Sequence, residues 1–139
     1  MEEATTPTID FSGIWLSDYT FHSSSKNADM QSRHYVRILQ KGETIVVESV
    51  PELNSSYLIA RFSLNGNIAT GSWEENTATD GDYKGAMYSG AAQMIIDPAA
   101  RTMKGAWVGY GKRMEIKTGP WEIKYAGDDA SQFEKLPPL

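Results

Sequence analysis

The sequence predicts an all-β protein whose strands form an up-and-down antiparallel β-barrel of eight or nine strands. Apolar and polar residues alternate with period two along most of the chain, and no window of helical period reaches three turns. Turn sequences such as Asn65-Gly66 separate the alternating segments. Each of the four tryptophans follows a glycine by two residues, so glycine and ring share one face of a strand. Glycines at such positions let a sheet curl tightly, which favours a barrel over the alternative, a two-sheet β-sandwich.

Residues 11–126 form the predicted barrel domain, and the segments on either side are predicted to be flexible tails. Residues 1–10 and 127–139 are polar and hold too few apolar side chains to order themselves. A chain of 139 residues fits one domain that is large enough to bury a core of its own.

The first half of the barrel is predicted to contain five strands and one long loop. The first strand is Phe11–Phe21, where Gly13 and the aromatic residues share one face. Ser23–Ser32, rich in Ser, Asn and Asp, is predicted to be a loop at the barrel mouth because it exceeds the usual hairpin length. The remaining strands, separated by turns at Lys41-Gly42, Pro51–Ser56 and Asn65-Gly66, are His34–Gln40, Thr44–Val50, Tyr57–Leu64 and Ile68–Asn76.

The second half begins with another predicted mouth loop, Thr77–Asp82, which contains Thr-Asp-Gly-Asp. Tyr83–Ile96 is predicted to be a long strand with a bulge at Gly90, followed by a turn at Asp97-Pro98. Thr102–Gly109 follows, and Gly109-Tyr110-Gly111 is predicted to break that strand. The last two predicted strands are Lys112–Lys117 and Pro120–Ala126.

Composition and motifs argue against several classes of function. The net charge is -5 and no basic run occurs, which argues against direct binding of nucleic acid. No apolar stretch approaches the roughly 20 residues of a membrane helix, so we expect a soluble, cytoplasmic protein. The chain has no cysteine, and His22 and His34 lie in no catalytic or metal-binding motif. We therefore expect no catalytic residues, no metal and no cofactor.

Gly13-Ile14-Trp15, on the first strand and before a long loop, resembles the opening motif of the calycins, which comprise lipocalins, fatty-acid-binding proteins and avidin-like barrels. The resemblance implies a barrel whose interior holds a ligand. In lipocalins this tryptophan closes one end of the barrel and a basic residue near the last strand packs on it. The resemblance makes Lys124 the candidate for that role in this chain.

A second resemblance extends from about residue 11 to residue 125. The segments that carry it are Trp15–Tyr19, His34–Val36, Ala69–Glu75, Tyr83–Ala91 and Lys104–Gly109. They are similar to a domain of unassigned function that forms the C-terminal half of some bacterial helix-turn-helix regulators and signalling proteins. This resemblance implies a sensory or effector-binding module that works with an output domain, and this sequence contains no DNA-binding helix pair of its own.

The side chains predicted to face the barrel interior form the candidate ligand site. By strand parity they are Trp15, Tyr19, Phe21, Phe62, Trp73, Met87, Trp107, Met114, Trp121 and Tyr125. Rings with a polar tip suit an organic ligand, and rings beside glycines also serve to fill a small barrel. Glu75 shares the parity of Trp73, so it either faces the interior, where desolvation raises a carboxyl pKa, or ends the strand in solvent. The predicted ligand contacts are Trp15, Tyr19, Arg61, Trp73, Glu75, Tyr88 and Trp107. Further candidates for polar contacts are His34, Arg37 and Gln93.

Two classes of function remain open. The first is a non-enzymatic barrel that binds a small hydrophobic or aromatic organic ligand, which enters between the two predicted mouth loops. The second is a filled barrel that acts through its surface as an interaction or dimerisation module, with exposed tyrosines and methionines forming a homodimer face. An isomerase or cyclase that uses Glu75 as a base is a third, less favoured alternative.

Overall fold

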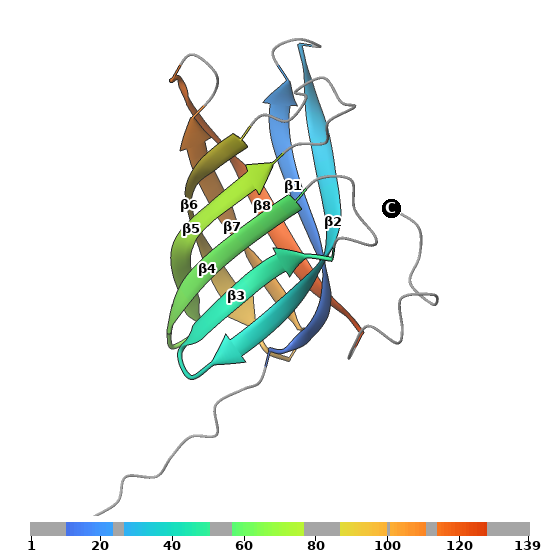
Figure 1. Ribbon diagram of the computed structural model, residues 1–139, viewed down its shortest axis with the longest axis vertical. Helices are drawn as coiled ribbons and strands as arrows, with labels where there is room; N and C mark the ends of the chain where they lie inside the picture. The colour runs from blue at the N-terminus through green and yellow to red at the C-terminus, as the bar shows by residue number, and fades with distance from the viewer. Residues whose placement is uncertain are drawn as a thin grey trace, which may run out of the picture.

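The computed structural model is a closed antiparallel barrel whose eight strands follow one another around the wall in sequence order (Figure 1). It describes residues 11–23, 27–50, 57–76, 87–99, 101–110 and 114–127. The strands are β1 (Gly13–Ser23), β2 (Ala28–Lys41), β3 (Thr44–Ser49), β4 (Tyr57–Asn65), β5 (Ile68–Asn76), β6 (Met87–Asp97), β7 (Thr102–Tyr110) and β8 (Ile116–Gly127). The described residues contain no helix, and hence no helix that could span a membrane. The predicted all-β barrel is confirmed with eight strands, and the sandwich alternative is wrong.

Two of the tight turns have the backbone that the sequence predicts. Gly42, between β2 and β3, and Gly66, between β4 and β5, have φ values of +61° and +62°. This left-handed conformation is easily adopted only by glycine, which is why Asn65-Gly66 marks a hairpin. The predicted turns are confirmed, and β5 has the predicted bounds.

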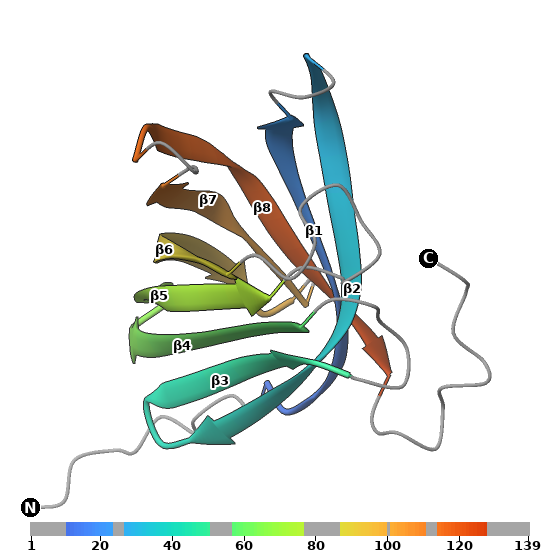
Figure 2. The ribbon, with the colours of Figure 1, turned by 45° about the horizontal axis from the view of Figure 1, so that its top comes forward.

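The predicted loop at Ser23–Ser32 is wrong, because most of it is strand. β1 continues to Ser23 and β2 begins at Ala28, with Phe21 paired to Met30. The polar composition reflects exposure rather than loop structure, since the β1–β2 hairpin extends beyond the neighbouring strands (Figures 1 and 2). The other predicted mouth loop, Thr77–Asp82, lies outside the described residues, as do the first residues of the predicted strand Tyr83–Ile96.

The last part of the wall also differs from the prediction. Lys112–Lys117 and Pro120–Ala126 are not two strands, because one strand, β8, runs from Ile116 through Gly119-Pro120 to Gly127. The predicted bulge at Gly90 is wrong, since the registers with β5 and β7 pass through it without a shift. By contrast, β7 ends at Tyr110, one residue beyond its predicted end and within the predicted break at Gly109-Tyr110-Gly111.

Pro120 is compatible with a strand because of where the β1–β8 pairing stops. The last pair between β1 and β8 is Tyr19 with Trp121, and beyond it β8 pairs only with β7. Pro120 therefore stands on a strand edge, where its missing N–H interrupts no bond to β1. Side chains bridge the two strands there: Trp107 Nε1 donates to the Thr20 carbonyl at 3.1 Å, and Lys117 Nζ donates to the His22 carbonyl at 3.5 Å.

Glycine allows the close packing of the strands that closes the wall. A Cβ atom on Gly71 would lie 1.8 Å from the Arg61 carbonyl oxygen of the neighbouring strand. Gly105 is equally restricted, with 1.9 Å to the Gln93 carbonyl oxygen. The glycines of the Gly-x-Trp pattern therefore make room for neighbouring backbone, which sharpens the prediction that they let the sheet curl.

Apolar side chains fill the interior from the closed end upward. The largest fully buried side chains facing this interior are Trp15, Phe62, Ile38, Ile45, Leu58, Met94, Met103 and Ile123. Trp15 is 1% exposed and donates its indole N–H to the Phe11 carbonyl at 2.9 Å. Its other neighbour is the Tyr125 ring, at 5.6 Å between centroids. Burial of this size is the main source of stability in such a small barrel.

The basic residue at the closed end is not Lys124, as the calycin resemblance implies. Lys124 is exposed and lies 3.5 Å from Glu122 on the outer face. Arg101, from the β6–β7 turn, instead stacks over the Tyr125 ring at 4.4 Å from its centroid. The Tyr125 ring thus lies between the Arg101 guanidinium and Trp15.

Candidate functional site

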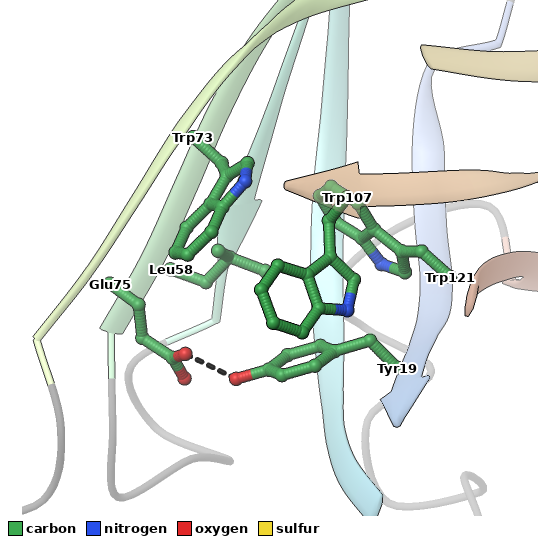
Figure 3. A pocket seen from close by; sticks show the side chains of 6 residues that line it. All are labelled: Tyr19, Leu58, Trp73, Glu75, Trp107 and Trp121. Carbon is green, nitrogen blue, oxygen red and sulfur yellow. Dashed lines mark hydrogen bonds between the residues drawn. The ribbon is translucent and has the colours of Figure 1, made fainter. Parts of the chain in front are cut away.

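A small hollow at the open end of the barrel is the candidate site. Six side chains line it: Tyr19, Leu58, Trp73, Glu75, Trp107 and Trp121 (Figure 3). The innermost space between them, about 10 Å³, is enough for one water molecule. Measured out to its open side, the hollow is about 200 Å³. A larger ligand must therefore lie over the rings rather than deep among them.

The tryptophan rings of the hollow are held in place by hydrogen bonds from their N–H groups. Trp73 donates to the Ala91 carbonyl at 3.1 Å, and Trp121 donates to Ser17 Oγ at 2.8 Å. Trp107 donates to Thr20, as described above. Trp73 and Trp107 meet edge to face, at 5.7 Å between centroids and an interplanar angle of 90°. Indoles anchored in this way form a preorganised apolar surface.

Glu75 is the acidic group of the hollow. It is only 7% exposed, on the inner face near the end of β5, whereas its neighbour Glu74 is exposed. The Tyr19 hydroxyl donates a hydrogen bond to Glu75 Oε1, as the dashed line in Figure 3 shows. His34 Nε2 lies 3.5 Å from Glu75 Oε2. The inward alternative for Glu75 is therefore confirmed, and the solvated strand end is wrong.

Burial shifts the titration of the two groups that flank Glu75. Desolvation, together with the adjacent Glu75 carboxylate, raises the pKa of Tyr19 well above its usual value of 10. Desolvation lowers the pKa of His34 from 6.5 to about 4, and the ring is 3% exposed and stacked on Tyr19. The carboxylate acts in the opposite direction on His34, but burial dominates. Near neutral pH both groups are uncharged partners of Glu75.

The structure brings together four of the seven predicted ligand contacts: Tyr19, Trp73, Glu75 and Trp107 line the hollow. Tyr88 lies beside them, because β6 pairs it with Glu75 and its hydroxyl oxygen is buried. Trp15 lies in the core at the closed end, and Arg61 is exposed on the outer face of β4.

Two methionines predicted to face the interior do not do so. Met87 is 65% exposed and Met114 is 75% exposed. Met87 lies outside because the absence of a bulge at Gly90 leaves Tyr88 on the inner face. Met114 precedes β8 and has a positive φ of 63°, so strand alternation does not apply to it.

Three residues of the site are missing from the predicted contacts: Leu58, Trp121 and His34. The parity of Leu58 with Phe62, and that of Trp121 with Ile123, puts both side chains inside the barrel. His34 is one of the further candidates for polar contacts, but the prediction that its strand begins at this residue leaves its direction open. The strand in fact starts six residues earlier, and His34 shares the inner face with Val36 and Ile38.

The chemistry available at the hollow is limited to ring contacts, hydrogen bonds and one carboxylate. Within the described ranges, no group of three or more His, Asp or Glu side chains is arranged to hold a metal ion. Tyr19, Glu75 and His34 can orient a polar group of a ligand, while the indoles contact its apolar part.

Comparison with known proteins adds nothing about the site. No family model matches the chain, and no curated protein matches it significantly. Among solved structures, it is similar to a Trp-to-Ala mutant of Transferrin Binding Protein B, a vaccine antigen, from Haemophilus parasuis Hp5. The identity is 14% over 83% of this chain, with a TM-score of 0.48. The chain covers 26% of that protein, about a quarter of its length.

Proposed function

We propose that the protein is a non-enzymatic barrel that binds a small organic ligand at its open end. The observation that carries this proposal is the convergence of Tyr19, Trp73, Trp107 and the buried carboxylate of Glu75 on one hollow. Binding pockets typically combine an apolar, aromatic lining with a few fixed polar groups. The ligand lies over the indoles, because the closed half of the barrel is occupied by core side chains.

Intrinsic tryptophan fluorescence tests this proposal with a library of aromatic and lipophilic compounds. A ligand over Trp73 and Trp107 is expected to change the emission and raise the melting temperature. Trp107→Phe is expected to weaken binding several-fold, because the ring face shrinks and the bond to Thr20 is lost. Val108→Ala, on the outer face beside it, serves as the matched control. A library in which no compound changes emission or melting temperature contradicts the proposal.

The regulatory part of the proposal rests on the resemblance to bacterial regulators. We propose that the barrel is the sensory or effector-binding module of a cytoplasmic regulatory or signalling system and acts on a separate output domain. The domain context of the gene is the direct test: output domains should be fused to this module or encoded beside it. Consistent association with unrelated metabolic genes would count against a sensory role.

A surface role is the second candidate function, and exposed apolar residues favour it. Val108, Tyr110 and Ile116 are 40%, 53% and 73% exposed on the β7–β8 hairpin, and Met114 precedes β8. Exposed apolar groups of this kind occur at protein interfaces, including those of homodimers. Analytical ultracentrifugation distinguishes the two functions: a dimer that Ile116→Lys dissociates supports the surface role, and a monomer at high concentration opposes it.

A further inference from the structure

The innermost space of the hollow has room for one small polar group. At about 10 Å³ it accommodates a water molecule, and a protonated primary amine group is about as large. A quaternary ammonium group has no N–H and cannot donate a hydrogen bond to a carboxylate there. The residues around the space therefore suit a group that donates hydrogen bonds.

The electrostatics of the lining favour a cation. Glu75 contributes a carboxylate that Tyr19 holds in place from one side, while His34 approaches its other oxygen. An ammonium group beside a carboxylate keeps that carboxylate ionised and forms a charge-assisted hydrogen bond with it. Such a bond is stronger in a desolvated site than at the surface.

The aromatic rings act in the same direction. The Tyr19 ring lies 6.2 Å from the Trp107 ring at an interplanar angle of 73°, and Trp107 meets Trp73 edge to face. The negative face of an indole or phenol ring attracts a cation, and tryptophan attracts it most strongly. The carboxylate of Glu75 and the rings of Tyr19, Trp73, Trp107 and Trp121 thus line the same hollow (Figure 3).

Building on the proposed ligand-binding function, we infer that the ligand is a primary amine that binds as its ammonium ion. The ammonium group occupies the water-sized space against Glu75, and the apolar body of the ligand covers Trp73 and Trp107. Lys117, which has the parity of the inner face of β8, does not take this place. Its ammonium group lies 3.5 Å from the His22 carbonyl and 3.8 Å from Glu115.

Isothermal titration calorimetry with three related probes tests the inference on the intact chain at pH 7. The probes are benzylamine, the neutral benzyl alcohol and the bulkier benzyltrimethylammonium. Benzylamine is expected to bind at least tenfold more tightly than either of the others. Glu75→Gln is expected to weaken benzylamine binding at least tenfold and to leave benzyl alcohol unchanged. Glu74→Gln, on the outer face of the same strand, is the matched control and should leave all three affinities unchanged.

The outcomes separate this inference from the function on which it rests. Equal affinity for benzylamine and benzyl alcohol overturns the inference but leaves an aromatic-binding site in place. Tighter binding of benzyltrimethylammonium overturns the assignment to a primary amine. If none of the probes, nor any compound of the fluorescence library, binds the wild-type protein, the proposed function fails as well. The comparison of probes on wild-type protein stands even if Glu75→Gln does not fold.

Discussion

The Tyr19 hydroxyl donates a hydrogen bond to Glu75 Oε1, which joins β1 to β5 between residues 56 positions apart in the chain. β1 and β5 are not neighbours in the wall, so this bond crosses the open end of the barrel. It fixes a carboxylate that would otherwise be costly to bury among tryptophan rings. The bond therefore belongs both to the stability of the fold and to the geometry of the site.

Removal of this hydroxyl should destabilise the protein. In Tyr19→Phe the buried carboxylate loses a donor, and we expect the free energy of unfolding to fall by about 1 to 3 kcal/mol. Chemical denaturation followed by circular dichroism gives the value. Tyr57→Phe is the matched control, because Tyr57 donates to Glu48 at 2.6 Å on the outer face. There we expect a loss of about 1 kcal/mol or less. Equal losses in the two variants would show that the Tyr19–Glu75 bond contributes no more to stability than the Tyr57–Glu48 bond.

The burial of His34 should make stability depend on pH. Its pKa is lowered to about 4 in the folded protein and is about 6.5 when unfolded, so between these values the unfolded chain binds more protons. The contribution is fully present above pH 6.5 and is lost progressively as the pH falls toward 4, by about 3 kcal/mol. Unfolding curves measured across this range should show the loss in wild type but not in His34→Gln.

The exposed histidine provides the control for this measurement. His22→Gln should keep the pH dependence of the wild type, because the ring of His22 lies on the surface. Greater stability at pH 5 than at pH 7, specific to His34, would mean that the Glu75 carboxylate at 3.5 Å outweighs desolvation. The direction of the slope thus decides between the two influences on His34.

The close strand contact at Gly71 should tolerate no side chain. Gly71→Ala places a methyl group 1.8 Å from a backbone carbonyl, so the two strands must separate. We expect a loss of about 3 kcal/mol in the free energy of unfolding. Ser72→Ala, exposed on the next position of β5, should stay within about 0.5 kcal/mol of wild type. A stable Gly71→Ala protein with an unchanged melting temperature would refute the packing argument.

At the closed end, Arg101 rather than Lys124 should matter for stability. Arg101→Gln removes the cation over the Tyr125 ring while keeping a long side chain at the same backbone conformation. We expect a loss of about 0.5 to 1 kcal/mol, typical of an exposed cation–π contact. Lys124→Gln should change the melting temperature little, since an exposed pair with Glu122 contributes little. A larger effect at Lys124 would restore the role that the calycin resemblance implies.

Strand positions and most inward faces could be predicted from the sequence, because alternation and turn residues are local signals. β5 matches its prediction, and the parity of Trp73 correctly places Glu75 inside. The prediction fails where no large apolar residue fixes which of the alternating positions face inward. With β8 divided in two, Met114 is predicted to face the interior. In the continuous strand, Trp121 sets the phase and Ile116 points out, 73% exposed.

The site itself required closure of the barrel. Tyr19, His34 and Glu75 lie on β1, β2 and β5, and only the curvature of the wall brings β5 across from the first two. No local pattern records that approach, so the sequence names His34 as a candidate polar contact but does not place it beside Glu75. The flexible tails, the cytoplasmic location and the homodimer remain predictions.

Because the backbone pairing of β1 with β8 ends early, these two strands are held together less firmly toward the open end of the barrel. From Ile14 to Tyr19 a backbone ladder joins β1 to β8, but beyond Tyr19 and Trp121 the two strands are joined by the Trp107 and Lys117 side chains. A few side-chain hydrogen bonds break at a lower free energy than a backbone ladder. We therefore expect local opening of the native barrel to begin between β1 and β8 in this region. Trp107 both joins β7 to β1 in this region and lines the hollow. A ligand that covers its ring would therefore also restrain the local opening between β1 and β8.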